Sequence, residues 1–118
     1  MFGQVLIGLI GLLHVYILVL EMFLWDKPTG LKAFANTPEK AKLTKVMAQN
    51  QGLYNGFLAA GLFWSLFAAE HYALALANFF LGCVLIAGIY GGLTASKKII
   101  YIQAAPALLT LLVINLMS

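Results

Sequence analysis

Four long apolar stretches constrain this chain more than any other feature. They run from about 2 to 25, 46 to 69, 72 to 93 and 99 to 117, and Glu21 is the one charged residue within them. A helix needs about 20 predominantly apolar residues to cross the hydrocarbon core of a bilayer. The pattern therefore predicts four transmembrane helices, joined by a loop over 26–45 and by two short connections.

The amino-acid composition excludes the other protein classes. Hydrophobic residues make up 63% of the 118 residues and charged residues 9%, whereas about a quarter of a soluble domain is charged. The chain is also too apolar and too poor in charge to be disordered. We therefore expect one all-α transmembrane domain covering 1–118, a four-helix bundle that crosses the cell membrane several times. The first stretch lacks a basic region and a cleavage site, so we expect it to stay in the mature protein.

The lysines predict the orientation of the bundle. All seven basic residues are lysines, five of them in 26–45 and two at Lys97 and Lys98. With four spans these two connections lie on the same side, and the positive-inside rule places them in the cytoplasm with both termini outside. The lysines flank apolar segments and form no basic face with interleaved aromatic residues, so no nucleic-acid partner is expected. Membrane lipids are the expected partners.

The loop over 26–45 carries its own structural signals. The segment 26–30, Asp-Lys-Pro-Thr-Gly, is typical of a turn. Thr37 suits a helix N-cap and Pro38 suits the first helical position. The second helix is therefore predicted to begin near 38 and to project from the membrane before it enters at about 46.

Small residues at four-residue spacing predict close helix packing. Small residues recur at this spacing in the second stretch, at Gly52, Gly56 and Ala60, and in the third stretch, at Gly88 and Gly92. On the second helix, this small-residue stripe is predicted to lie on a different side from a polar face of Gln51, Asn55, Leu58 and Ser65. We interpret the stripes as contacts within the bundle, with a homodimer interface as the alternative.

Polar side chains inside the predicted spans concentrate in the cytoplasmic halves. His14 lies near the middle of the first span, and Glu21 follows two helical turns later on the same face, with Trp25 continuing it. Pro106 should free a backbone carbonyl near the midplane. These residues predict a pocket open to the cytoplasm or to lipid. Its candidate ligand-binding residues are His14, Glu21, Trp25, Asn50, Gln51, Tyr54, Asn55, Tyr90 and Gln103.

Most members of this set also have a structural interpretation. An Asn or Gln in a membrane bundle most often hydrogen-bonds a neighbouring helix, a contact worth about 0.6 kcal/mol. A tyrosine or tryptophan near the end of a span is typical of the interfacial aromatic belt. Glu21 is harder to explain in this way, because a carboxylate in hydrocarbon is costly and this short side chain reaches the interface poorly. Glu21 is therefore the strongest functional candidate.

One stretch of sequence resembles a known family. It is the run 50–62, Asn-Gln-Gly-Leu-Tyr-Asn-Gly-Phe-Leu-Ala-Ala-Gly-Leu, joined by His14, Glu21-Met22-Phe23 and Trp25. Together these residues resemble the small four-span membrane family catalogued as domain of unknown function 1304, over essentially the whole chain. The resemblance implies an integral membrane protein with four helices and no established activity, so it assigns no catalytic residue.

Three kinds of function fit the predicted pocket. The first is binding or transport of a small amphiphilic molecule, with Glu21 neutralising a cation or exchanging it for a proton. The second is a membrane enzyme, for example an isomerase of a lipid-like substrate. In such an enzyme His14 and Glu21 would act as separate acid–base groups, about 10 Å apart along the helix. The third is a structural or accessory membrane subunit.

A metal site or a cofactor is not expected. His14 and Glu21 are too far apart to share one ion, and the sequence has no cluster of His and Cys with ligand spacing. Cys83 stands alone, so it can form no intrachain disulfide, and a mechanism that needs a cysteine pair is excluded.

Overall fold

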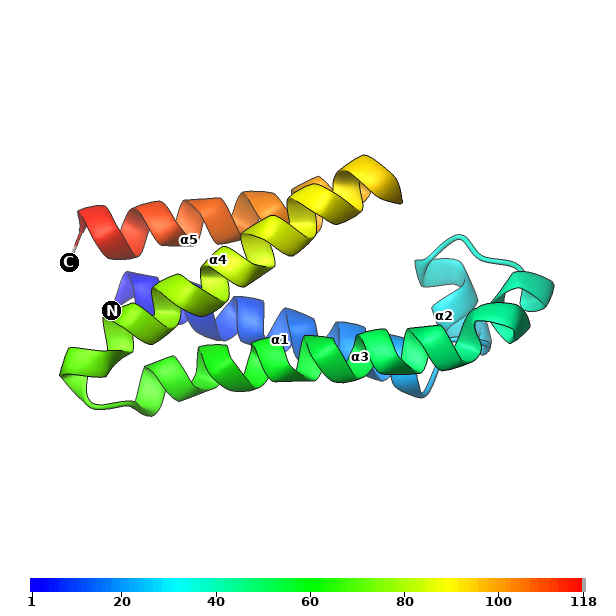
Figure 1. Ribbon diagram of the computed structural model, residues 1–118, viewed down its shortest axis with the longest axis horizontal. Coiled ribbons are helices and arrows are strands. Elements are labelled where there is room, and N and C mark those ends of the chain that lie inside the picture. The colour runs from blue at the N-terminus through cyan, green and yellow to red at the C-terminus, as the bar shows by residue number, and fades with distance from the viewer. Residues whose placement is uncertain (118) are drawn as a thin grey trace. The chain divides into compact units, whose positions relative to one another are not determined.

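The computed structural model describes residues 1–117, and every element in that range is helical. In chain order the elements are α1 (Phe2–Met22), α2 (Pro28–Ala33), α3 (Pro38–Phe67), α4 (Glu70–Thr94), the wide π-helical segment η1 (Ile100–Ala104) and α5 (Ala105–Leu116) (Figure 1). The chain divides into two compact units. We call residues 12–59 the central unit, and residues 1–11 with those from 60 onward the terminal unit. The predicted all-α class is confirmed.

In the central unit, α1 and α3 meet along a seam of small side chains. The buried residues of α3 in this unit recur at the spacing of one helix face: Ala41, Ala48, Gly52, Asn55 and Ala59. A Cβ at Gly52 would lie 2.5 Å from Cγ of Met22 and 3.2 Å from the carbonyl oxygen of Leu18. The glycine therefore allows the two helices to approach closely.

The turn predicted over 26–30 is replaced in part by a short helix. Pro28 is the first residue of α2 because its fixed φ suits a helix N-terminus and its missing N–H costs nothing there. Gly30 lies inside α2, is buried and has no positive φ. A Cβ at Gly30 would overlap the carbonyl oxygen of Leu24. The glycine is needed for this close backbone approach. The predicted turn is therefore confirmed at 26–27, where the Lys27 N–H donates to the carbonyl of Leu24 over 3.0 Å, and is wrong for 28–30, which are helical.

The start of α3 is as predicted. Pro38 is its first residue, and the Thr37 Oγ1 accepts a hydrogen bond of 3.3 Å from the backbone N–H of Lys40. Two residues before this cap, Ala35 has a φ of 50°. This left-handed conformation costs a residue with a Cβ about 1 to 2 kcal/mol.

In the terminal unit, α4 and the η1–α5 segment form a helical hairpin, with Lys97 and Lys98 in the connection. The buried residues of α4 are Ala77, Leu81, Val84, Gly88 and Gly92. Those of η1 and α5 are Ala104, Ala107, Thr110 and Ile114. A Cβ at Gly88 would lie 2.6 Å from the backbone nitrogen of Ala104. The packing role predicted for Gly88 and Gly92 is confirmed.

The fourth apolar stretch contains a wide helical turn that the sequence did not predict. The backbone N–H of Ala105 donates to the carbonyl of Ile100, five residues back, and Pro106 follows. A proline has no N–H to donate, and its ring collides with the carbonyl four residues earlier, here that of Ile102. Widening the preceding turn relieves this collision, which explains why η1 comes directly before Pro106.

Many exposed side chains of α1, α4 and the later turns of α3 are large and apolar, whereas the first turns of α3 expose charged residues. Among the large exposed hydrophobic side chains are Phe2, Leu9, Phe57, Trp64, Phe79 and Ile86. A helix that is apolar on all sides is typical of a membrane span. By length and composition, the 21 residues of α1 and the 25 residues of α4 could each cross a membrane, and 100–116 forms a shorter apolar helix.

Candidate functional site

The central unit contains a buried hydrogen bond between a carboxylate and an amide. Asn55 Nδ2 on α3 donates to Glu21 Oε1 on α1 over 2.6 Å, and the two residues are 34 positions apart in sequence. Glu21 is 8% exposed and Asn55 is 4% exposed. The bond is shorter than the usual length of an N–H···O hydrogen bond, about 2.9 to 3.0 Å. Both residues are in the predicted set, and the structure brings them together.

Gly52 positions this pair. A Cβ at Gly52 would lie 3.1 Å from Cβ of Glu21, so the absence of a side chain lets the glutamate sit against the α3 backbone. Gly52 and Asn55 are therefore on the same side of α3, while Gln51 is exposed. The prediction that the glycine stripe and the Asn55 face lie on different sides of this helix is wrong. The close packing at Gly52 and the hydrogen bond of Asn55 occur in one seam, because positions 52 and 55 are close to one helical turn apart.

His14 lies on the same helix as Glu21, and its side chain is completely buried. The burial of both residues confirms that they share the inward face of α1. Seven residues of helical rise separate them by about 10 Å, so the two side chains cannot bond to each other directly.

Trp25 lies beyond α1, which ends at Met22, and it anchors the connection to α3. Its Nε1 donates to Thr44 Oγ1 over 3.1 Å, and its ring lies 4.9 Å from that of Phe34. The prediction that Trp25 continues the helical face of His14 and Glu21 is wrong, because the chain has left the helix. No pattern in the sequence indicates Thr44 as its partner.

An ion pair that was not predicted links the start of the same connection to α3. Lys45 Nζ lies 3.0 Å from Asp26 Oδ2 and donates a hydrogen bond to it. This hydrogen bond to Lys45 lowers the pKa of Asp26 below its ordinary value. Both side chains are partly open to solvent, so the pair is screened.

The other predicted site residues are not gathered around Glu21 by any described contact. Asn50 is exposed, and its Nδ2 donates to the carbonyl of Val46 on its own helix. Tyr54 is also exposed. Tyr90, which is exposed, and Gln103, on η1 and half-buried, belong to the terminal unit. A pocket formed by all nine residues stays a prediction.

A second polar pair joins α4 to α5 in the terminal unit. Asn78 Nδ2 donates to Asn115 Oδ1 over 3.2 Å, and Asn115 Nδ2 donates to Asn78 Oδ1 over 2.7 Å. Each amide also donates to a backbone carbonyl of its own helix, those of Leu74 and Leu111. No role was predicted for these two residues, although their similar depth in the third and fourth apolar stretches was a usable signal.

The terminal unit also contains a cavity of about 310 Å³. It lies where α1 begins, α3 ends, α4 begins and α5 ends, and none of the nine predicted ligand-binding residues lines it. Its walls include apolar side chains, and its polar side chains come from Gln4, Ser65 and Glu70. Within residues 1–117, no group of three or more His, Cys, Asp or Glu side chains could hold a metal ion.

These features define an all-α protein with two helices of membrane-spanning length and a buried carboxylate–amide pair. The chain belongs to the family described as "Protein of unknown function (DUF1304)", which matches residues 8–115, so the resemblance found in the sequence is confirmed. It is similar to the uncharacterized protein YpaA of Lactococcus lactis subsp. lactis (strain IL1403), with 32% identity over 106 residues, 88% of either chain. No solved structure matches the chain. Neither description assigns an activity.

Proposed function

We propose that this chain is a multi-pass cell-membrane protein that binds or transports a small amphiphilic molecule, with Glu21 as the group that engages its charge. The four spans of this proposal are α1, α3, α4 and the segment of η1 with α5. The ligand lies in the cytoplasmic half of the membrane, where Asn55 orients it beside Glu21. The observation that carries the proposal is the buried Glu21–Asn55 hydrogen bond.

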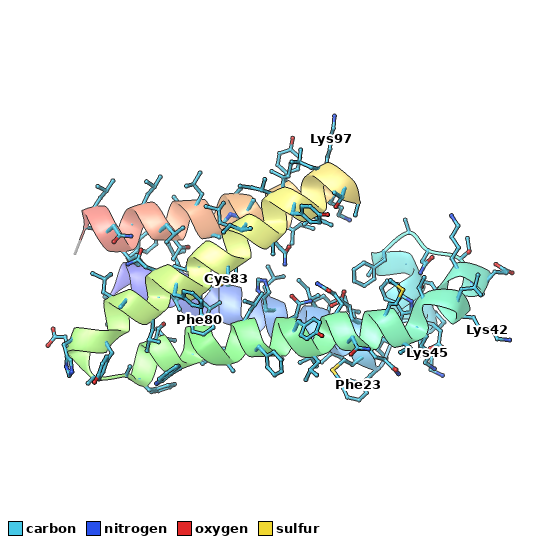
Figure 2. The ribbon with its side chains drawn as sticks, viewed as in Figure 1. Phe23, Lys42, Lys45, Phe80, Cys83 and Lys97 are labelled. Atoms are coloured by element: carbon cyan, nitrogen blue, oxygen red, sulfur yellow. The ribbon has the colours of Figure 1, made fainter. Side chains whose placement is uncertain are left out.

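The lysines support the orientation of this bundle. Figure 2 shows Lys97 at the far end of α4, beyond which the hairpin turns, and Lys42 and Lys45 on the first turns of α3. The helix α4 rises about 36 Å from Glu70, its first residue, to Thr94, its last. Glu70 and the connection that contains Lys97 therefore lie at opposite ends of this helix. The two lysine-bearing connections would lie in the cytoplasm, with both termini outside.

A comparison of the two polar pairs supports a functional role for Glu21. Asn78 and Asn115 show that this chain can join two helices with amides alone, through two reciprocal hydrogen bonds. Glu21 and Asn55 join α1 to α3 through one bond, and one partner is ionisable. An amide would serve equally well as a helix–helix contact. The carboxyl group adds a proton that can be exchanged, which is the usual reason for an acid within a membrane.

The proposed exchange balances one proton against one positive charge. When a cationic head group arrives, the O–H bond of the Glu21 carboxylic acid breaks and the proton passes to water. The carboxylate then neutralises the cation. Asn55 Nδ2 can donate to a Glu21 oxygen before and after this step, so the helix contact persists.

A membrane enzyme is the second candidate, and the complete burial of His14 on the Glu21 face favours it. In that case the two groups would act at separate atoms of one lipid-like substrate. A structural or accessory subunit is the third candidate.

Native mass spectrometry in a mild detergent tests these alternatives with three forms of the protein: wild type, Glu21→Gln and the control Glu39→Gln, which alters an exposed glutamate on α3. The proposal predicts a retained small molecule in the wild type and the control, and its loss in Glu21→Gln. Chemical conversion of that molecule during incubation would indicate the enzyme. Equal retention of the molecule by all three forms would contradict the role of Glu21, and no retained molecule in any form would contradict the proposal and favour a structural role.

A further inference from the structure

We propose that the cavity of the terminal unit is a separate binding site for a small cationic amphiphile, whose head group is recognised by Glu70. The cavity is built from four helix ends of one compact unit, and its volume of about 310 Å³ is at the lower end of the range for small-ligand sites. Nothing in the proposed role of Glu21 requires this site.

The lining combines an apolar body with one charged side chain. Ile7, Leu66, Leu74 and Ile114 come from four different helices and line the cavity with branched aliphatic side chains. Such a lining accepts a short hydrocarbon chain because burying apolar surface is favourable, at about 25 cal/mol per Å².

The polar part of the lining selects a positive charge. Glu70 is exposed and is the one charged side chain among the lining residues, and no lysine lines the cavity. Met1 also lines it, but the ion pair described within residues 1–117 joins Asp26 to Lys45, so neither a lysine nor the amino group of Met1 forms an ion pair with Glu70. Ser65 Oγ donates to the carbonyl of Leu62 and is already bonded. A quaternary ammonium group needs no hydrogen-bond acceptor and is attracted by one carboxylate, so it suits this lining better than a sugar or an anion.

Cysteine protection tests the site directly, with octyltrimethylammonium as the probe. The background is Cys83→Ala, because Cys83 is the single native thiol. Ala73→Cys places a thiol in the cavity wall, and Ala69→Cys, at an exposed position just before α4 and outside the lining, is the matched control. The rate of maleimide modification is measured in a nonionic detergent as the probe concentration is raised.

The expected result is protection at Ala73→Cys and none at Ala69→Cys. Adding Glu70→Gln should raise the probe concentration for half-protection roughly three- to fivefold, the effect of removing one partly exposed ion pair. Adding Glu39→Gln should leave it unchanged. Glu39 is also a first-turn glutamate, so the two variants lose the same charge and the probe enters their micelles equally.

Two results would overturn the proposal. The first is equal modification of Ala73→Cys with and without the probe, which would show that the cavity is not a site. The second is equal protection by octyltrimethylammonium and by octanol, unchanged by Glu70→Gln, which would exclude recognition of a cation. Adding Glu21→Gln should leave the protection intact, so failure of the Glu21 proposal and failure of this one are distinguishable. Circular dichroism confirms that each variant is folded.

Discussion

Asn55 on α3 donates a 2.6 Å hydrogen bond to the carboxyl group of Glu21 on α1, and both side chains are buried. Gly52 makes room for the contact, since a Cβ there would lie 3.1 Å from Cβ of Glu21. The pair therefore depends on three positions that share one seam between two helices.

The first prediction concerns the energy of this pair. Asn55→Leu should lower the free energy of unfolding by about 2 kcal/mol, because it leaves a buried acid without its donor. Glu21→Gln should change it by less than about 1 kcal/mol, since the new amide oxygen can still accept. Unfolding in mixed micelles, followed by circular dichroism, measures both. The double variant Glu21→Leu/Asn55→Leu should be more stable than Asn55→Leu alone. If its loss of unfolding free energy equals the sum of the losses of Glu21→Leu and Asn55→Leu, the two side chains are not energetically coupled and the prediction is contradicted.

The second prediction concerns the α4–η1 contact. Gly88→Ala should lower the free energy of unfolding by about 2 kcal/mol, because the new Cβ would lie 2.6 Å from the Ala104 backbone nitrogen and one helix must shift. Gly82 lies on the same helix, and a Cβ added there would meet no neighbouring atom within 4 Å. Gly82→Ala should be neutral or stabilising, by up to about 1 kcal/mol. Equal effects of the two substitutions on thermal unfolding would refute this packing argument.

The third prediction is a pH dependence at the Asp26–Lys45 pair. The pKa of Asp26 is lowered in the folded state, so its contribution to stability is present above the ordinary carboxyl pKa and is lost as the pH falls through the lowered value. Asp26→Asn should therefore reduce the melting temperature slightly at neutral pH and have no effect in strong acid. High salt should shrink the difference at neutral pH. A difference that grows toward acid pH would give the opposite sign and contradict the pairing.

The fourth prediction concerns the backbone at Ala35, where φ is 50°. Ala35→Gly should leave stability unchanged or raise it by up to about 1 kcal/mol, because relief of the left-handed strain exceeds the added entropy of the unfolded chain. Ala33→Gly, at the exposed end of α2, is the control and should cost up to about 1 kcal/mol. Thermal melts should therefore show a lower melting temperature for Ala33→Gly and an equal or higher one for Ala35→Gly, and a clear loss at Ala35→Gly would count against the backbone conformation.

The positions of most helices along the chain could be predicted, because they depend on local sequence signals. Long apolar runs, the Thr37 cap and Pro38 indicate helix positions directly, and His14 and Glu21 share a face by helical periodicity alone. The short α2 was missed because Pro28 suits a turn and a helix N-terminus equally, and only contact with Leu24 explains Gly30.

The partners of the site residues could not be predicted because they depend on how two helices are rotated against each other. Assigning Asn55 to the face of Gln51 separated it from Gly52, although the structure places Gly52 and Asn55 in one seam. The cavity was missed for a similar reason: its walls come from four helix ends, and no local pattern marks where those ends meet.

The central claim, that Glu21 exchanges a proton for a cationic molecule, is tested most directly by proton release. Octyltrimethylammonium is added to the protein in an unbuffered nonionic detergent solution, and a pH indicator records the change. The account predicts proton release by the wild type and by Glu70→Gln, and none by Glu21→Gln. Equal release by the wild type and Glu21→Gln, or no release by either, would contradict it.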